Sequence, residues 1–393
     1  MRIFFLIVLT LLVNACESDT NSEAAPGTRA SDAAAAPTTE NDAPLQPVAD
    51  ATQNTISTGI DASSDGAPSV QSDSGSPGTL DSSSMSADAA DVGTTRNDVT
   101  DGSEVTSEKE AGAPETQRDA GPRTPVFKKT SCIDPNMISA NSEVNFPCEG
   151  VDLWISLPAQ CITRACGLIF NIHGGGMVDR TWMENATNMV ALGKANDYIV
   201  VHPHKGTWRV STDKSVVFTF MEQAIEAFDV DRKRIHATGY SQGGQISWAL
   251  ACEHADIIAS VAPTEEINRV SNCWKSGALP AREIPVLFAY GKQDNIGGGY
   301  DAAQQAVNDF VDSYSMTGPE TIAGTEGTAY HRQRWTSASG NVLEFITHDY
   351  RNSLLAGHCL PLEGGTTLVS CSEPVDYNWG EEAVAFFKAH PML

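Results

Sequence analysis

The chain has 393 residues, a net charge of −25 and nine cysteines. The charge is distributed unevenly, because residues 17–125 hold 20 acidic and five basic residues, whereas residues 126–393 carry a net charge of −11. An acidic balance of this kind argues against nucleic acid as a partner. The C-terminal part, about 270 residues long, is large enough for one α/β domain with a substantial core.

The N-terminus has the pattern of an export signal. Arg2 precedes an apolar run, Ile3 to Val13, which has the length of a signal-peptide core and is too short to span a bilayer. The following Ala15-Cys16 resembles the lipobox of bacterial lipoproteins, in which the cysteine is lipidated and becomes the new N-terminus. Asn14 is unusual in such a box, so secretion without a lipid is the alternative. We expect residues 1–16 to be a lipoprotein-type signal peptide and the lipid on Cys16 to hold the protein on a membrane, in the periplasm or at the cell surface.

Residues 17–125 contain no Phe, Tyr or Trp and consist mainly of Ala, Ser, Asp, Thr, Pro and Gly. Such a segment cannot bury enough apolar surface to offset the entropy lost on ordering. We therefore predict a disordered acidic linker over 17–125, followed by a catalytic domain over 126–393.

Eight cysteines fall in the C-terminal domain, an even number behind an export signal, which favours disulfides. Closure between cysteines near in sequence suggests the pairs Cys132–Cys148, Cys161–Cys166, Cys252–Cys273 and Cys359–Cys371, although sequence alone does not fix the pairing. No Cys-x-x-Cys pair is present, so we expect no metal site and no cofactor.

Strands and helices alternate along the domain. Apolar alternation or short apolar runs predict strands at 151–157, 167–172, 198–201, 234–238, 257–262 and 284–290, and a hairpin from 333–336 and 342–347. Helical patterns cover 185–196, 215–228, 242–254, 302–314 and 381–389. This order predicts an α/β fold, a mostly parallel sheet with helices on both faces, whose functional residues lie at the carboxyl ends of the strands.

A Gly-x-Ser-x-Gly motif stands between a predicted strand and a predicted helix. Its residues are Gly239-Tyr240-Ser241-Gln242-Gly243. In this context the motif is typical of a nucleophile elbow, a tight turn that strains the serine backbone and exposes its Oγ. We therefore predict that Ser241 is a catalytic nucleophile.

A nucleophilic serine needs a histidine base and a carboxylate that orients it, and on such a sheet the chain order is serine, acid, histidine. We assign the acid to Asp294, on the loop after the strand at 284–290, with Asp301 as the substitute. We assign the base to His358, which follows Gly357 and precedes a cysteine that could hold its loop. His348 is the competing base.

The oxyanion of an acyl-transfer intermediate needs preorganised donors. One is the backbone N–H of Gln242, at the start of a helix. The turn His173-Gly174-Gly175-Gly176 offers a second, from Gly175 or Gly176. We expect His173 and Tyr240 to line the substrate site.

Several stretches together resemble one family. They are the elbow with its preceding residues 232–238, Ala251-Cys252-Glu253, Ser260-Val261-Ala262-Pro263, Pro285-Val286-Leu287 with Gly291 and Asp294, and Gly357-His358. Over roughly Leu153 to Phe387 the chain is similar to the polyhydroxybutyrate depolymerase and feruloyl esterase-like family of α/β-hydrolases. The resemblance implies the α/β-hydrolase fold and a secreted, metal-independent serine esterase that acts on short polyester, hydroxycinnamate or acetyl esters, with Ser241, Asp294 and His358 as its triad.

The chain departs from this family at two places beside the predicted pocket. The family often has a cysteine where this chain has Gly175, and Trp-Pro-Gly shortly after the histidine where this chain has Cys359-Leu360-Pro361-Leu362. The expected substrate is therefore a small-molecule or polymer ester of open identity. A serine peptidase or other acyl hydrolase on the same scaffold and a non-catalytic surface binding protein are the alternatives. The oligomeric state is left open.

Overall fold

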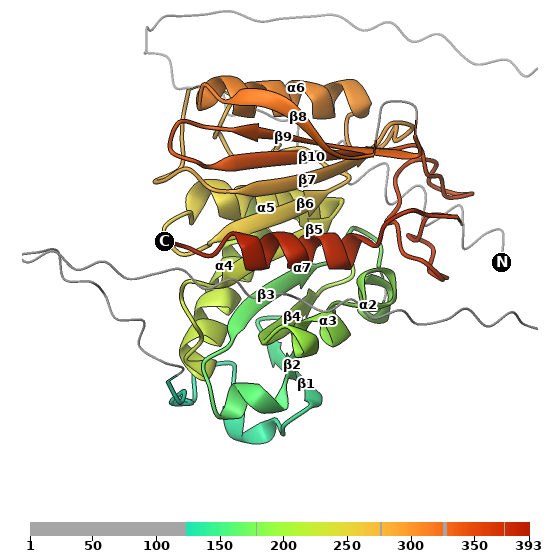
Figure 1. Ribbon diagram of the computed structural model, residues 1–393. Coiled ribbons are helices and arrows are strands. Elements are labelled where there is room, and N and C mark those ends of the chain that lie inside the picture. Colours follow the sequence, from blue (N-terminus) through green and yellow to red (C-terminus); the bar gives the residue numbers. More distant parts are fainter. Residues whose placement is uncertain (1–122, 178, 276, 325–327, 373) are drawn as a thin grey trace, which may run out of the picture. The chain divides into compact units, whose positions relative to one another are not determined.

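The computed structural model describes residues 123–393 apart from 178, 276, 325–327 and 373 (Figure 1). The predicted signal peptide, Cys16 and all but the last residues of the predicted linker lie outside this range. The described strands are β1 (Ser142–Cys148), β2 (Val151–Leu157), β3 (Gly167–Ile172), β4 (Tyr198–His204), β5 (Ile235–Tyr240), β6 (Ser260–Thr264), β7 (Val286–Gly291), β8 (Thr317–Gly324), β9 (Tyr330–Thr336) and β10 (Val342–His348). The helices are η1 (Pro135–Met137), η2 (Ala159–Ile162), α2 (Thr181–Thr187), α3 (Met189–Ala195), α4 (Val210–Phe228), α5 (Gln242–Glu253), α6 (Tyr300–Ser313) and α7 (Trp379–Ala389).

The described strands form one sheet in the order β1-β2-β4-β3-β5-β6-β7-β10-β9-β8. The central strands, from β4 to β10 in this order, run parallel, and an antiparallel pair extends the sheet on each side. This topology confirms the predicted fold class, an α/β-hydrolase sheet. The chain leaves β3 toward β4 on one side and returns to β5 on the other, which creates a switch point where such sheets bind ligands.

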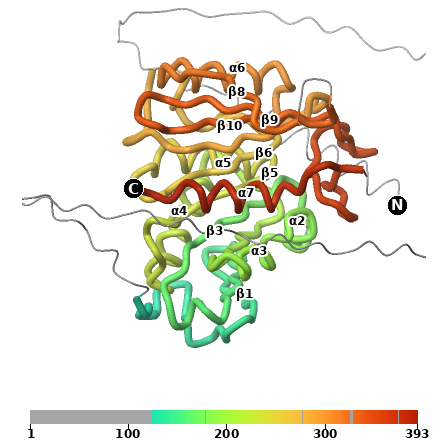
Figure 2. Tube along the Cα trace, in the orientation of Figure 1, coloured from blue at the N-terminus to red at the C-terminus, as the bar shows by residue number. Residues whose placement is uncertain are grey.

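Helices cover both faces of the sheet, each over its own apolar core. One core contains side chains of α4, α5 and α6, such as Phe220, Ile246 and Phe310. The other contains side chains of α2, α3 and α7, such as Met183, Met189 and Phe387. Figure 1 shows α7 crossing in front of the sheet, and the trace in Figure 2 shows it next to the segment of α2 and α3, which it contacts. The parallel strands are therefore buried from both sides, as their apolar runs predict.

Three differences from the predicted elements have local causes. The helix expected at 185–196 is divided into α2 and α3, because Asn188 adopts a left-handed conformation with φ 52°. The strand expected at 257–262 begins only at Ser260, since the N–H groups of Ile257 and Ile258 bond to the carbonyl of His254 in a turn. The edge strands β1 and β8 were missed, because neither has the apolar pattern of a buried strand.

The eight cysteines of the described domain form the disulfides Cys132–Cys148, Cys161–Cys166, Cys252–Cys273 and Cys359–Cys371, the pairs expected from local closure. Such bonds are typical of proteins from oxidising compartments. Among the helices of the described residues, none is both long and apolar enough to cross a membrane.

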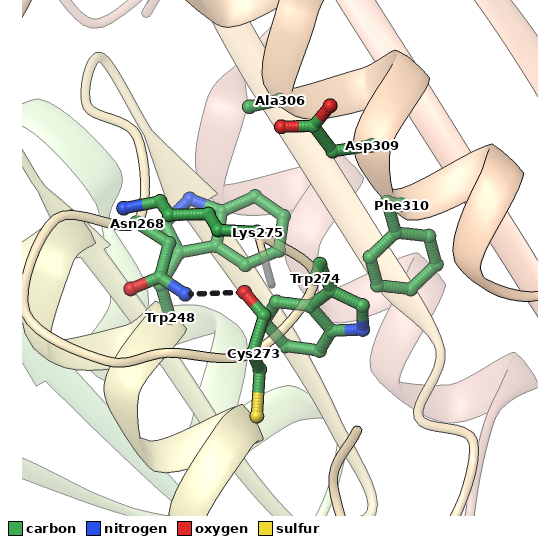
Figure 3. Close-up of a pocket in the computed structure, with 8 residues that line it drawn as sticks. All are labelled: Trp248, Asn268, Cys273, Trp274, Lys275, Ala306, Asp309 and Phe310. Carbon is green, nitrogen blue, oxygen red and sulfur yellow. Dashed lines mark hydrogen bonds between the residues drawn. The ribbon is translucent and has the colours of Figure 1, made fainter. Parts of the chain in front are cut away.

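Aromatic residues surround a cavity of about 20 Å³ beside the Cys252–Cys273 bond. Figure 3 shows Trp248, Trp274 and Phe310 around it, with the Asn268 amide donating to the carbonyl of Cys273. A cavity of this size holds about one water molecule. The aromatic residues here therefore act as core.

Candidate active site

Ser241 lies at a strained turn between β5 and α5. Its backbone has φ 54° and ψ −119°, a conformation that residues other than glycine rarely adopt. A Cβ on Gly239 would lie 2.2 Å from the carbonyl oxygen of Gly243, and one on Gly243 would lie 2.1 Å from that of Ile172. Both glycines are thus required for the close approach of the strand and the helix. The N–H of Ser241 donates to the carbonyl of Thr264 at 3.0 Å, which ties the turn to β6.

His358 and Asp294 form a buried pair at the carboxyl end of the sheet. His358 Nδ1 lies 2.6 Å from Asp294 Oδ2, and both side chains are almost fully buried. Asp294 Oδ1 accepts a hydrogen bond from the N–H of Ile296 at 2.7 Å. Gly357 allows the two loops to touch, because a Cβ there would lie 2.5 Å from the backbone nitrogen of Asp294. The carboxylate of Asp294 is thus held by its own loop on one side and contacts His358 on the other.

The electrostatics of this pair suit a base. Burial lowers the pKa of His358, but the charge of Asp294 and the hydrogen bond to it outweigh burial and raise the pKa above its ordinary value. His358 Nε2 is buried and has no hydrogen-bond partner among the described residues, Ser241 included. The hydrogen bonds of catalytic groups are often long in unliganded enzymes and tighten with substrate. Nε2 is the nitrogen that is left to take a proton.

Tyr240 joins the serine turn to the histidine loop. Its ring centroid lies 4.9 Å from that of His358, and its hydroxyl donates to the backbone carbonyl of His358 at 2.8 Å. Tyr240 is 3% exposed and directly precedes Ser241. Tyr240, expected to line the substrate site, therefore contacts both the ring and the backbone of His358.

The glycine turn after β3 lies against the start of α5. A Cβ on Gly174 would lie 3.2 Å from Ser241 Cβ, and one on Gly175 would lie 2.7 Å from Gln242 Oε1. The N–H of Gly176 donates to Thr207 Oγ1 at 3.1 Å, so this amide already has a partner. Of the two glycines expected to offer an oxyanion donor, the geometry favours Gly175.

His173 fixes this turn from inside the protein. Burial lowers its pKa to about 3, so the ring is neutral at pH 7. Nδ1 donates to the carbonyl of Gly174 at 2.6 Å, and Nε2 accepts from the N–H of Lys205 at 3.2 Å. With both ring nitrogens occupied, His173 shapes the backbone and has no free nitrogen for a substrate.

The substitute residues lie elsewhere. Asp301 is exposed in the first turn of α6, where a negative charge stabilises the helix. His348, at the end of β10, is buried with Nε2 2.9 Å from Glu265 Oε1. Neither replaces the pair formed by Asp294 and His358.

Glu265 belongs to the same buried cluster and was not identified from the sequence. One ligand atom from each of Glu265, Asp294 and His358 lie within 4.8 Å of one another, close enough to hold one metal ion. The hydrogen bond between His358 and Asp294 already satisfies two of these groups, and we interpret the cluster as hydrogen-bonded. The sequence signal that could have identified it is the Glu265-Glu266 pair directly after a buried strand. Glutamates are rarely fully buried unless they are paired, so this position indicates specific partners.

Comparison with known proteins gives distant relatives. No family model matches the chain. The chain is 25% identical over 154 residues to the bifunctional acetylxylan esterase/xylanase XynS20E of Neocallimastix patriciarum, which covers 37% of this chain and 22% of the relative. It is 32% identical over 151 residues to feruloyl esterase B of Piromyces equi, which covers 34% of this chain and 27% of the relative. Both relatives are esterases, and the chain spans about a quarter of their length.

Among solved structures, the protein is similar to an acetyl xylan esterase from Aspergillus awamori, with a TM-score of 0.45 and 15% identity over 57% of this chain and 96% of that one. It is also similar to Est1E from Butyrivibrio proteoclasticus, with a TM-score of 0.32 and 16% identity over 43% of this chain and 84% of that one.

Proposed function

We propose that the protein is a serine carboxylic ester hydrolase that works through an acyl-enzyme. Ser241 is the nucleophile, His358 the general base and Asp294 the residue that orients the base. The observation that carries this proposal is the buried His358–Asp294 hydrogen bond of 2.6 Å, at the same sheet edge as a serine in strained elbow geometry. The esterase relatives support the reaction class.

In the first half-reaction, Ser241 Oγ attacks the ester carbonyl carbon while His358 Nε2 takes the hydroxyl proton. Asp294 accepts the hydrogen bond from Nδ1–H of His358 and stabilises the imidazolium that forms. The tetrahedral intermediate collapses when the bond to the leaving alcohol breaks, and His358 returns the proton to that oxygen. Water then repeats these steps on the acyl-enzyme, which releases the acid and restores Ser241.

The negative charge on the intermediate oxygen requires donors that are already in place. We assign them to the N–H groups of Gln242 and Gly175. Gln242 is the first residue of α5, where the helix dipole favours negative charge. The side chain of Gln242 is fixed by the N–H of Trp208, which donates to its Oε1 at 3.0 Å. This contact keeps the start of α5 against the turn that carries Gly175.

For the substrate we propose an acetyl or feruloyl ester, because the relatives are named for these activities. A polyhydroxybutyrate-type polyester is the further candidate from the sequence resemblance. Gly175 and the segment Cys359 to Leu362, where the chain departs from that family, lie at the oxyanion turn and beside the base. They are the positions expected to set the preference.

We further propose that the domain of residues 126–393 is exported and held on a membrane by a lipid on Cys16, through the linker at 17–125. The disulfides support export. The test is incorporation of an alkynyl fatty acid in the native host by wild type and Cys16→Ser. Label on neither variant contradicts the anchor and leaves secretion, and label on both contradicts Cys16 as the lipidated residue.

The experiment for the reaction combines a fluorophosphonate probe with ester turnover. We expect labelling of wild type and none of Ser241→Ala. Asp294→Asn should lower kcat on p-nitrophenyl acetate by about 10⁴-fold, as loss of the orienting carboxylate does in other triads. Asp301→Asn is the matched control and should retain wild-type kcat. Labelling with turnover of amides alone points to a peptidase, and no labelling of wild type points to a binding protein.

A further inference from the structure

Glu265 is a fully buried carboxylic acid next to the proposed triad. It directly follows β6, with φ 57°, and its N–H donates to the carbonyl of Ala289 on β7 at 3.0 Å. Its side chain is 0% exposed. Residues other than glycine rarely adopt this backbone conformation. The chain thus places a buried carboxyl group next to the site.

Three groups surround this carboxyl. Oε2 accepts a hydrogen bond from the N–H of Gly291 at 2.9 Å, and Oε1 lies 2.9 Å from His348 Nε2. The carboxyl of Asp294 is the third, since the nearest ligand atoms of Glu265, Asp294 and His358 fall within 4.8 Å of one another. Two buried carboxyl groups at this separation do not both carry a charge without a cation.

The neighbouring residue, Glu266, has a different kind of partner. Glu266 is also 0% exposed, and its Oε1 is paired with Arg269 Nε at 2.9 Å. The corresponding partner of Glu265 is His348, and burial lowers the pKa of His348 to about 4, so the ring is neutral at pH 7. Apart from His358, which is cationic only below its own pKa, Glu265 therefore has no cation beside it among the described residues.

Outside the cluster, the other ionisable groups near it in the described part of the chain supply no unpaired cation. Burial and the charge of Glu265 raise the pKa of three tyrosines, which are therefore neutral at pH 7. They are Tyr240, Tyr290 and Tyr377. Lys292 and Asp349 pair with each other at 3.1 Å. Burial and the charge of Asp294 raise the pKa of Glu265 well above its ordinary value, against the opposite effects of His358 and the Gly291 amide.

We propose that Glu265 is a positioning residue that stays protonated and donates a hydrogen bond to the carboxylate of Asp294. In this arrangement Nε2–H of neutral His348 donates to Oε1 of Glu265, and the proton of Glu265 is left for Asp294. Asp294 then receives hydrogen bonds from Ile296, His358 and Glu265, which hold its carboxylate in one orientation. The inference rests on the proposed triad, because Glu265 acts on the reaction only through Asp294 and His358.

The variants Glu265→Gln and Glu265→Ala separate this role from a charged one. Glutamine is neutral and has nearly the same shape. Its NH2 group can take the place of Oε1 when neutral His348 changes tautomer and accepts at Nε2, which leaves the second N–H of the amide as a donor for Asp294. E265Q should therefore retain kcat within about 3-fold. E265A should lower kcat about 10- to 100-fold with little change in KM, the effect of losing a hydrogen bond to a charged group. The acid limb of the kcat/KM profile, which reports His358, should stay in place in E265Q.

An anionic Glu265 gives the opposite result. Removing its charge in E265Q would lower the pKa of His358, shift the acid limb to lower pH and reduce kcat as much as E265A does. That outcome overturns the proposal. Thermal melting of both variants identifies any loss that is due to unfolding.

Infrared spectroscopy tests the proposal without turnover. The difference spectrum of wild type and E265Q at pH 7 should contain the carbonyl band of a protonated carboxylic acid, and the matched variant E266Q should not remove that band. A carboxylate band lost in E265Q instead overturns the proposal. If wild type hydrolyses no ester, the proposed function fails while this measurement still reads the state of Glu265.

Discussion

The two halves of the proposed site are built in different ways. The serine turn joins β5 to α5, and its geometry follows from residues within a few positions of one another, above all Gly239 and Gly243. The histidine lies in an irregular segment between β10 and α7, which the Cys359–Cys371 disulfide closes and the hydroxyl of Tyr240, distant in sequence, contacts. Local sequence therefore determines the geometry at Ser241, the proposed nucleophile, whereas tertiary contacts help to position His358, the proposed base.

The largest expected effect is at the serine turn itself. Ser241→Ala should lower kcat on p-nitrophenyl acetate by about 10⁴- to 10⁶-fold, as removal of a nucleophile does. Ser241→Gly should be equally inactive and more stable than Ser241→Ala by about 1 kcal/mol, because glycine relieves the strain of φ 54°. Urea unfolding compares the two variants. Equal stabilities would mean that the turn stores no strain.

Breaking the disulfide beside His358, the proposed base, should have the next largest effect. Cys359→Ser with Cys371→Ser opens a loop with a sequence separation of 12, which should cost about 2–4 kcal/mol of unfolding free energy. Because His358 is adjacent, kcat should also fall about 10- to 100-fold. The matched control replaces Cys252 and Cys273, with a separation of 21, and should lose stability with kcat nearly unchanged. Equal kcat losses would contradict a special role for the 359–371 bond.

Tyr240→Phe tests the contact between the two halves. The variant loses the hydrogen bond to the carbonyl of His358, and at about 0.5–1.5 kcal/mol for such a bond we expect kcat to fall about 2- to 10-fold. Tyr350→Phe is a suitable control, since its hydroxyl bonds to Asp376 at 2.9 Å, away from His358. A wild-type kcat in Tyr240→Phe would show that the disulfide alone holds the base.

The smallest change is a shift in pH dependence. Only neutral His358 accepts a proton, so kcat/KM should fall as the pH drops through a pKa that lies above 6.5. Stability should have the opposite trend. A raised pKa in the folded state stabilises the protein below the unfolded value, and this contribution is lost as pH rises through the folded pKa. Rate profiles and urea midpoints check both, and Asp294→Asn should move the acid limb to lower pH.

The sequence predicted the parts of the site that depend on short-range patterns. The elbow at Ser241, the sheet class and the local disulfide pairs follow from glycine spacing, apolar runs and cysteine proximity. The positions of Asp294 and His358 after strands also follow from the topology, and the structure brings these two together. The catalytic roles stay predictions.

Long-range packing decided what the sequence could not provide. Tyr240 and His173 were expected beside the substrate, but both turn their polar atoms to backbone groups that shape the site. The sequence did not predict the contacts of Glu265, because its partners His348, Asp294 and Gly291 come from later parts of the chain. Edge strand β8 is mostly exposed and has no apolar face for a pattern to mark.

The end of β6 serves both halves through two consecutive residues. The carbonyl of Thr264 receives the N–H of Ser241, and Glu265 reaches β7 through Ala289 and Gly291. A randomised library aimed at new acyl preferences should therefore spare positions 264 and 265 and vary the segment after His358 instead. Insertions at this junction would disturb the contacts of both Ser241 and Glu265, which makes it a poor place to graft a loop.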